Sequence, residues 1–446
     1  MKNLFQKYDV PAPRYTSYPT VPYWENTPST DQWCTNLRTH LSSNDASFSL
    51  YIHIPYCETL CTFCGCNNVI TKDHKKEVPY VESVLKEWSL YLQNVPEIRN
   101  AELKLLHLGG GTPTFLSADH LKQLLEPILK SVKVAKNFEG SIEVDPRRTT
   151  ALQLQALREL GFNRISLGVQ DFDPEVQRLI NRLQPFEITE RITEEARQLG
   201  YQSVNFDLIY GLARQTKDSI LTTVSKTLEL QPDRIALYSL ALVPWIKPAQ
   251  RLFKDEDLPA GEEKRTLYEV ARFALLDAGY VEIGMDHFAL PQEALSLSQK
   301  KGELHRNFMG YTDQKTPVLL GLGVSSISET PDMFHQNEKV LPTYFQQIEK
   351  EKIPTFRGHV LTDEDKRQRQ QILEFMTKGK VKLAESQLKE AREFLKEMEK
   401  DGLIQFQESF LILTEKGHPF LRNACLFFDE RLKRKQPTTQ VFSKAV

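Results

Sequence analysis

The sequence predicts an α/β fold, a partial TIM-like (β/α)6 barrel, and two observations lead to that prediction. Short runs rich in β-branched and aromatic residues alternate about six times with segments of helical character, which favours parallel βα units. Nearly every run ends in glycine or an unusual polar residue, and catalytic groups at the ends of many strands are typical of a barrel mouth. A doubly wound sheet also fits the alternation, so the polar strand ends are what favours the barrel.

The expected strands and helices follow one another along the first half of the chain. The strands are residues 49–54, 103–108, 141–144, 164–169, 203–210 and 234–240. The helical segments between them are residues 76–95, 117–132, 151–161, 189–200 and 217–231. In the third of these, Leu152, Leu154, Leu157 and Leu160 have a mostly helical spacing, and Gly161 stands where a C-cap is expected.

The polar groups stand at corresponding places in successive strands. "GGGTPT" follows the second strand, Glu143 lies in the third, Gln170 follows the fourth and Asp207 lies within the fifth. Any one of them alone could equally cap the helix that follows it. Together they predict a site at the carboxyl ends of the strands.

Four segments are expected along the chain. Residues 1–44 form an N-terminal arm, 45–285 the barrel, 286–360 an extension of the barrel and 361–446 a mainly helical, winged-helix-like C-terminal domain. The stretch 285–314, where the extension begins, is expected to be loop-rich. Leu388, Ala391, Leu395 and Met398 form one stripe there, before a hairpin candidate and a last helix. The segment 385–401 carries six acidic against four basic residues, the wrong sign for contacts with nucleic acid phosphates, so packing against the barrel is expected.

Composition narrows the classes of function. The 446 residues are 40% hydrophobic and 26% charged, with 57 basic against 59 acidic residues and a net charge of −2. This balance favours neither nucleic acid nor an anionic membrane as a partner, so an acidic substrate needs locally clustered cations. The N-terminus has no apolar stretch of signal-peptide length, and no run reaches the roughly 18 apolar residues of a spanning helix, so a cytoplasmic protein is expected.

The stretch "PYCETLCTFCGCNN" holds four of the six cysteines. A disulfide framework is unusual in a reducing compartment, where such a group is more often metal-binding or catalytic. Cys57, Cys61 and Cys64 have the spacing C-x3-C-x2-C, without the second knuckle of a structural zinc site. The spacing favours an iron–sulfur cluster with one iron left free over zinc and leaves both open. His53 is expected to be a packed or hydrogen-bonded residue rather than a ligand.

The glycine run after the next expected strand strengthens the cluster interpretation. Gly109, Gly110 and Gly111 would let the backbone approach a ligand closely, although a lone glycine loop also fits a tight turn. With this loop one βα unit downstream of C-x3-C-x2-C, the chain resembles the radical S-adenosylmethionine (SAM) enzymes. That resemblance implies a [4Fe-4S] cluster held by Cys57, Cys61 and Cys64, and a cleaved SAM that yields a 5′-deoxyadenosyl radical.

Within that superfamily the resemblance runs nearly end to end to the oxygen-independent coproporphyrinogen III oxidases, also called coproporphyrinogen dehydrogenases. The matching stretches are "PRYTSYPT", "YIHIPYCETLCTFCGCN", "LHLGGGTPT", "IEVDPR", "GFNRISLGVQDF", "VQRLINR", "FDLIYGL", "GMDHFA", "LHRNFMGYT" and "LLGLGVSSIS". One departure is "ILEFMTKGKV" (372–381), where the family typically carries a Cys and an Asn, which bears on specificity.

The resemblance implies roles for individual residues. Cys66 would be a non-ligand beside the cluster. Tyr51, Gly110, Glu143 and Ile327 would line the cluster-bound SAM. A second SAM would contact Phe63, Gly111, Thr112, Gln170, Arg182, Asp207 and Ala241. For Arg182 the sequence alone would favour a helix surface charge.

The implied reaction is the oxidative decarboxylation of two propionates of coproporphyrinogen III to vinyls, which gives protoporphyrinogen IX for haem biosynthesis. It needs an electron donor and an electron acceptor that the sequence does not name. Arg14, His305 and Arg306 are the candidate contacts for the substrate carboxylates, and the basic tail "RLKRK" ranks below them because basic helix ends are usually solvated. The alternative is a haem-binding chaperone on the same fold. Nothing in the sequence indicates an obligate interface, so a monomer is expected.

Overall fold

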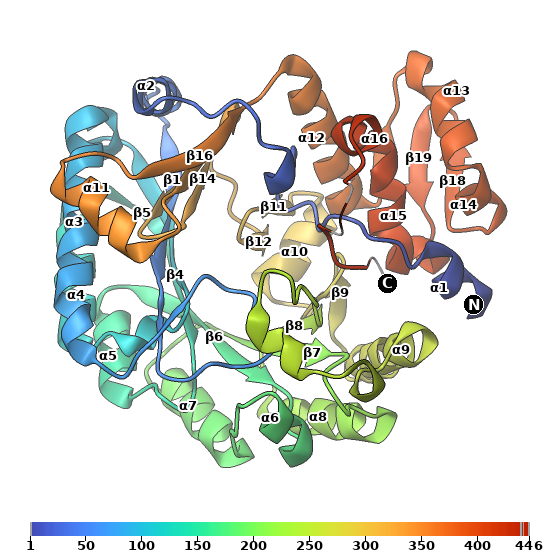
Figure 1. Ribbon diagram of the computed structural model, residues 1–446, viewed down its shortest axis with the longest axis horizontal. Helices are drawn as coiled ribbons and strands as arrows, with labels where there is room; N and C mark the ends of the chain where they lie inside the picture. The colour runs from blue at the N-terminus through green and yellow to red at the C-terminus, as the bar shows by residue number, and fades with distance from the viewer. Residues whose placement is uncertain (1, 438, 440, 445–446) are drawn as a thin grey trace.

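The computed structural model describes residues 2–437, 439 and 441–444. Its centre is a curved sheet in which six parallel strands lie in chain order (Figure 1). They are β1 (Ser47–Ile54), β4 (Glu102–Gly110), β5 (Lys133–Val144), β6 (Phe162–Gln170), β7 (Ser203–Tyr210) and β8 (Arg234–Ser239). All six expected strands and the parallel βα order are therefore confirmed.

Helices cover the convex face of these strands (Figure 1). They are α3 (Glu77–Asn94), α4 (Ala118–Lys130), α5 (Ala151–Glu159), α6 (Pro174–Leu179), α7 (Phe186–Gln198), α8 (Lys217–Leu230) and α9 (Gly261–Asp277). Strands buried on both faces are near-continuous apolar runs, and β1 and β7 each have seven buried residues of eight. The expectation for 151–161 needs one correction, because Leu152 is 70% exposed and the core face of α5 consists of Leu154 and Leu157.

The barrel stays open at one side. The sheet continues past β1 into β13 (Val318–Leu322), β14 (Ile327–Glu329), β15 (Met333–Asn337) and β16 (Thr355–Val360), and past β8 into β10 (His287–Ala289) and β9 (Val281–Ile283). Among the described residues, no strand pairing joins the edge strands β16 and β9. The partial barrel is confirmed.

The expectation of a loop-rich segment after residue 285 was wrong. Besides the strands that extend the sheet, this segment forms α10 (Ala294–Lys301), the hairpin β11 (His305–Asn307) and β12 (Gly310–Thr312), and α11 (Leu341–Glu349). In Figure 1, α10, β11 and β12 lie between the two sheet edges. These elements are three to nine residues long, too short for hydrophobic periodicity to reveal them.

The C-terminal domain combines helices with a small antiparallel sheet. Its elements are α12 (Asp363–Lys378), β17 (Lys380–Lys382), α13 (Glu385–Phe394), α14 (Lys396–Lys400), β18 (Ile404–Gln407), β19 (Phe410–Leu413), α15 (Leu421–Cys425) and α16 (Glu430–Arg434). The last helix was expected to be continuous and is instead broken, because Asp429 caps α16 by accepting from the Leu432 N–H at 3.0 Å. The four segment boundaries of the sequence stay predictions.

The N-terminal arm belongs to two hydrophobic cores. From α2 (Thr30–Leu41), Trp33 and Leu37 pack into the core of the barrel. From α1 (Lys2–Tyr8) and the segment after it, Phe5 and Tyr18 pack into the core of the C-terminal domain. In Figure 1 the arm runs from α2 past the C-terminal helices to α1, so it ties the two parts together.

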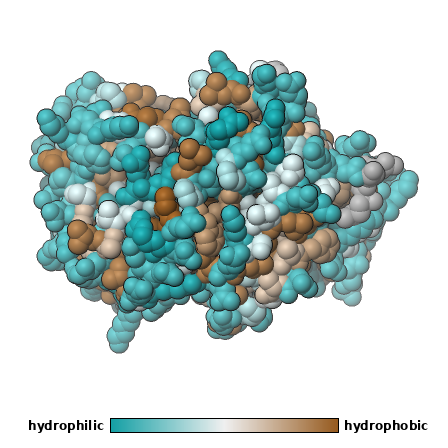
Figure 2. Space-filling model, turned by 90° about the horizontal axis from the view of Figure 1, so that it is seen from below, coloured by the Kyte–Doolittle hydropathy of each residue, from teal (hydrophilic) through white to brown (hydrophobic). Residues whose placement is uncertain are grey.

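Figure 2 shows a face on which apolar residues are scattered among hydrophilic ones. Within the described ranges, no helix combines the length and the apolar character needed to cross a bilayer.

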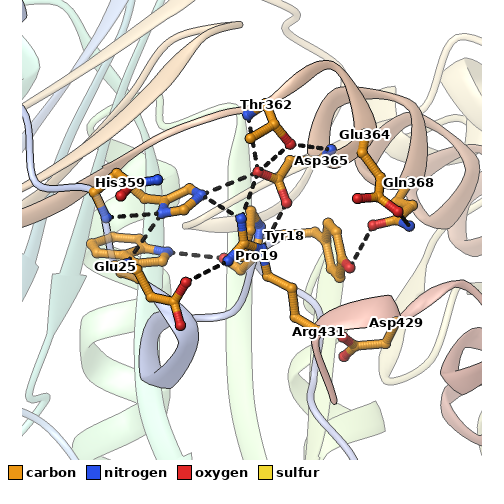
Figure 3. A network of polar contacts seen from close by, with 12 residues as sticks. Tyr18, Pro19, Glu25, His359, Thr362, Glu364, Asp365, Gln368, Asp429 and Arg431 are labelled. Atoms are coloured by element: carbon orange, nitrogen blue, oxygen red, sulfur yellow. Dashed lines mark hydrogen bonds and ion pairs between the residues drawn. The ribbon is translucent and has the colours of Figure 1, made fainter. Parts of the chain in front are cut away.

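A polar network of Glu25, His359, Asp365 and Arg431, buried except at Glu25, joins the arm, the end of β16 and the C-terminal domain (Figure 3). The Asp365 side chain is 3% exposed, and it accepts from Nε and Nη2 of Arg431 at 2.7 and 2.9 Å. Nδ1 of His359 accepts from the backbone N–H of Glu25 at 3.2 Å, and Nε2 lies 3.2 Å from Asp365. We call this set the Asp365 network.

Replacement of Asp365 by asparagine is expected to lower the free energy of unfolding by about 2 kcal/mol at pH 7, because it weakens the charge-assisted hydrogen bonds from Arg431, whose remaining ion pair is with the exposed Glu25. Burial opposes ionisation of Asp365, but the hydrogen bonds from His359 and Arg431 outweigh it and lower its pKa. The folded pKa thus lies below the unfolded one. The contribution is therefore present at neutral pH and is lost as the pH falls below about 4.

Denaturant titrations of wild type and variant at pH 7 and at acidic pH check this. Glu364→Gln is the matched control, because Glu364 is next to Asp365 on α12 and its ion pair with Arg434 of α16 is exposed, at 40% and 61% for the two side chains. We expect no measurable change in the control. An equal loss in both variants would contradict the assignment to the buried network.

Candidate active site at the carboxyl ends of the strands

One cavity of about 600 Å³ opens at the carboxyl ends of the parallel strands. Cys57, Cys61 and Cys64 border it, with Arg14 from the arm. Most of the other residues predicted for the site line it as well: Phe63, Gly110, Gly111, Thr112, Glu143, Gln170, Arg182, Asp207 and Ala241. The structure thus brings together side chains from the arm and from the ends of β4 to β8.

The cysteine loop is held against the neighbouring strand end and α6. The short strand β2 (Tyr56–Cys57) pairs with β3 (Val69–Ile70), and the Thr112 N–H donates to the Tyr56 carbonyl at 2.8 Å. On the other side, the Thr62 N–H donates to the Ile180 carbonyl at 3.1 Å. These backbone bonds fix the loop that carries the three cysteines.

Each of the three sulfurs has a polar donor beside it. The Thr112 hydroxyl lies 3.4 Å from the Cys57 sulfur. The Asn68 amide lies 3.4 Å from the Cys64 sulfur. Nη1 of Arg182 lies 3.7 Å from the Cys61 sulfur. Donors in these positions stabilise thiolates, the form that binds iron.

The fourth cysteine of the loop interacts with the third. A hydrogen bond with Cys66 lowers the pKa of Cys64 to about 6, and the same contact raises the pKa of Cys66. Burial raises the pKa of Cys57 to about 11.

The donor set fits a cluster better than a single ion. Among the described residues, no three His, Cys, Asp or Glu side chains gather closely enough to hold one metal ion. In a four-iron cluster each thiolate binds a different iron, so three cysteines on one loop suffice, and the fourth iron remains for a ligand.

The glycine run is required by the packing of the protein itself. A Cβ on Gly111 would lie 2.7 Å from the Pro55 carbonyl oxygen, and one on Gly110 would lie 2.6 Å from the His53 ring. Gly110 also has a φ of 116°, which favours glycine. The glycines therefore let the end of β4 lie close to the neighbouring β1 and β2, whether or not a ligand is bound.

His53 is hydrogen-bonded, as expected. Nε2 lies 2.8 Å from the Asn67 carbonyl, and Nδ1 lies 3.0 Å from the Tyr51 hydroxyl. Burial lowers its pKa, which keeps the ring neutral.

Glu143 is held as a carboxylate at the end of β5. It accepts from the Gly110 N–H at 3.1 Å, and its other oxygen lies 3.4 Å from Nε2 of His107. Nδ1 of His107 lies 2.6 Å from the Ser141 hydroxyl, which fixes the ring. Burial opposes ionisation of Glu143, but His107 and Gly110 outweigh it, so its pKa is lowered. Glu143 can therefore accept from donors of a ligand.

Asp207 lies within the same cavity at the end of β7. It accepts from the Ser166 hydroxyl at 2.8 Å and from the Asn205 amide at 2.9 Å. Burial and the charge of Glu143 raise the pKa of Asp207 to about 6. Near neutral pH its protonation is thus easily changed by a bound ligand.

Arg182 is a buried residue of the site and not the helix surface charge that its sequence context alone would favour. Its side chain is 7% exposed. Nη2 donates to the Gly168 carbonyl at 2.6 Å, and Nη1 lies 3.4 Å from Asp145. Among the described residues its Nε has no hydrogen-bond partner. This Nε is buried, so a ligand in the cavity would meet Arg182 through its charge at the cavity wall.

Four predicted residues lie outside the lining. Tyr51 stacks on His107 at 5.9 Å between ring centroids, behind Glu143. Ile327 is buried in β14. Arg306 lies behind the cavity wall, with its guanidinium 4.5 Å from the Tyr311 ring centroid. Burial lowers the pKa of His305 to about 4, so this residue is neutral at pH 7.

The lining also includes residues that were not singled out in the sequence, among them His107, Tyr238, His287 and Tyr311. His107 stands in "LHLGGGTPT", His287 in "GMDHFA" and Tyr311 in "LHRNFMGYT", so all three were quoted as parts of matching motifs without a role. Tyr238 lies inside an expected strand, where a single aromatic residue carries no signal of its own.

Comparisons with known proteins agree with this site. The model of the radical SAM superfamily matches residues 51–226. The chain is 39% identical to the oxygen-independent coproporphyrinogen III oxidase of Synechocystis sp. (strain ATCC 27184 / PCC 6803 / Kazusa), over 99% of this chain and 97% of that protein. It is 38% identical to the protein of the same name from Escherichia coli (strain K12), over 99% and 98% of the two chains.

A solved structure gives the same result. Coproporphyrinogen III oxidase (HemN) from Escherichia coli, described as a radical SAM enzyme, superposes with a TM-score of 0.89 at 37% identity, over 94% of this chain and 98% of that one. The chain therefore belongs to the radical SAM superfamily and, within it, to the family of the oxygen-independent coproporphyrinogen III oxidases.

Proposed function

We propose that this chain is an oxidoreductase that decarboxylates two propionates of coproporphyrinogen III to vinyl groups, giving protoporphyrinogen IX without oxygen. Each conversion removes one hydrogen atom, one CO2 and one electron from an ionised propionate. The observation that supports it most is the cavity itself, which has the three cysteines and the cationic Arg14 on its walls. The site thus offers ligands for a redox group and a contact for an acidic substrate.

Family membership implies a [4Fe-4S] cluster and SAM, which together supply the one-electron chemistry that takes a hydrogen atom from carbon. Cys57, Cys61 and Cys64 would hold the cluster. Glu143 would accept hydrogen bonds from the SAM beside it, with Gly110 giving backbone access. Tyr51 and Ile327 lie outside the cavity lining, so they would support the residues that contact that SAM.

A second SAM is part of the proposal. Aromatic, cationic and acidic groups suit its adenine, carboxylate and ammonium parts respectively. The residues proposed to contact it are Phe63, Gly111, Thr112, Gln170, Arg182, Asp207 and Ala241.

The substrate brings four carboxylates to a nearly neutral protein. Arg14 is the proposed direct contact, because it lines the cavity and its side chain is 31% exposed. Arg306 would act through the field of its charge from behind Tyr311. His305 stays a candidate only for an indirect role, since it is neutral and lies outside the lining.

The deciding experiment is an anaerobic incubation of cluster-reconstituted protein with coproporphyrinogen III, SAM and a reductant. We expect two vinyl groups per substrate, methionine and 5′-deoxyadenosine. Tight haem binding without any decarboxylation would overturn the proposal in favour of a haem chaperone on this fold. Colourless protein that binds zinc would overturn both.

We also propose that the protein acts as a cytoplasmic monomer with an external electron donor and an electron acceptor, and without nucleic acid or membrane partners. The near-zero net charge supports the last part. Sedimentation of the reconstituted protein would test the monomer.

A further inference from the structure

We propose that Arg14, Tyr238 and His287, positioned by Asp286, form a carboxylate subsite on the cavity wall that binds a propionate which the reaction leaves intact. The inference rests on the proposed function, because it assigns a place to part of that substrate. It adds His287 and Tyr238 as substrate contacts and gives Asp286 a positioning role.

Asp286 links Arg14 and His287. Its side chain is 7% exposed, Oδ1 lies 2.7 Å from Nδ1 of His287, and Oδ2 accepts from Nη2 of Arg14. Burial opposes its ionisation, but Arg14 and His287 outweigh burial and lower its pKa. Both carboxylate oxygens are thus occupied, and Asp286 fixes Arg14 and His287 instead of binding a ligand.

The contact with Asp286 sets the orientation of His287. Because the carboxylate only accepts, Nδ1 carries the proton, and Nε2 points to the Tyr238 hydroxyl at 3.5 Å. The imidazole packs edge-on between Tyr238 and Tyr311, with centroid distances of 5.7 and 5.5 Å. All three rings line the cavity, and Nε2 of His287 donates to a carboxylate there when the imidazole carries both protons, whereas with Nδ1 alone protonated it accepts from the Tyr238 hydroxyl.

The charges around the subsite leave room for an anion. Arg14 packs over the Tyr238 ring at 5.5 Å, and Arg306 lies behind Tyr311. Among the described residues, Nε of Arg306 is buried without a hydrogen-bond partner. In the part of the chain that the structure describes, Asp286 is the carboxylate that contacts both Arg14 and His287, while Asp207 and Glu143 lie further along the same cavity. The guanidinium of Arg14 borders the cavity, so it can pair with a substrate carboxylate there.

The arm holds Arg14 at this wall. Nε of Arg422 on α15 donates to the Pro13 carbonyl at 3.0 Å, and Arg422 also donates to the Ala12 carbonyl. The segment that carries Arg14 is therefore anchored to the C-terminal domain. Its guanidinium has little freedom left to lose when it binds an anion.

The chemistry decides which propionate belongs here. A propionate that reacts gives up its negative charge as neutral CO2. Cations paired with that carboxylate would stabilise the ground state more than the transition state and would slow the reaction. A pairing site of this kind suits the two propionates that remain in the product, and it would orient the macrocycle through them.

The test measures anaerobic equilibrium binding of coproporphyrinogen III to reconstituted wild type and to His287→Gln. We expect the dissociation constant to rise about tenfold in the variant, while iron content and SAM binding stay unchanged. His40→Gln is the matched control, because His40 also pairs with an aspartate, Asp332, at 2.6 Å, but lies on the outer helix α2. Binding within about twofold of wild type in His287→Gln would overturn the subsite.

Two additional measurements test the subsite independently of His287→Gln. Tyr238→Phe removes one hydroxyl and should weaken binding about threefold even if His287→Gln fails to fold. The tetramethyl ester of the substrate, in which the carboxylates are masked, should bind wild type at least about tenfold more weakly than the acid; equal binding would overturn carboxylate recognition. If wild type forms no vinyl product, the proposed function fails; if it forms product and the variants bind normally, the subsite alone fails.

Discussion

Replacement of Cys61 by alanine is expected to abolish turnover, with a loss of at least about 10³-fold, or roughly 4 kcal/mol of transition-state stabilisation. The three proposed cluster ligands lie on one loop that the backbone of β3 and α6 fixes, and the next cysteine along, Cys66, is engaged with Cys64. With one ligand lost, two thiolates remain for four irons. Iron content, the visible spectrum and vinyl formation measure the effect.

Cys66→Ala is the matched control, because it removes a thiol from the same loop. If Cys66 is a non-ligand, the variant keeps about four irons per chain and most of its activity. The assignment of three ligands would be wrong if Cys66→Ala lost iron as completely as Cys61→Ala. The pair of variants therefore tests the number of ligands as well as their identity.

The barrel could be predicted from the sequence because its strands are buried on both faces. Runs such as 203–210, with helices of ordinary length between them, carry the signal in their composition. The edges of the sheet could not be predicted in this way. β9, β10 and β14 have three residues each, too few for alternation to show, although β9 pairs with β10 and β14 with β13 and β15, which are close in the chain.

The core contacts of the N-terminal arm could not be predicted from the sequence either. Nothing in residues 1–44 indicates that Trp33 would join one core and Tyr18 another. The Asp365 network likewise joins residues separated by more than 300 positions. Such contacts follow from the way the domains pack, which local patterns do not encode.

The site residues also fall into two groups, those that the sequence could predict and those that it could not. The cysteines and the glycine run are close in sequence, so their spacing carries the signal. Arg14, Tyr238 and His287 come from three separate segments and meet only in the folded chain. The role of His107 depends on Glu143, which lies beside it in space but 36 positions away in the chain. The motif around His107 therefore did not reveal that role.

Replacement of Glu143 by glutamine is expected to raise KM for SAM between about 10-fold and 100-fold, because charge-assisted hydrogen bonds to a carboxylate contribute about 1.5–3 kcal/mol. The carboxylate is held ionised by His107 and Gly110, and its oxygens face the cavity beside the cysteine loop. Glutamine keeps the shape and loses the charge. SAM cleavage without substrate, followed as 5′-deoxyadenosine against SAM concentration, measures the effect.

Glu102→Gln at the exposed start of β4 is the control for the loss of one glutamate charge, and we expect it to leave KM unchanged. An unchanged KM in Glu143→Gln as well would show that the carboxylate serves only to hold Gly110 and His107. A higher KM with unchanged iron content would instead separate SAM binding from cluster binding. The two halves of the site then have independent tests: iron content reports on the cysteine loop, and KM reports on the strand ends that face it.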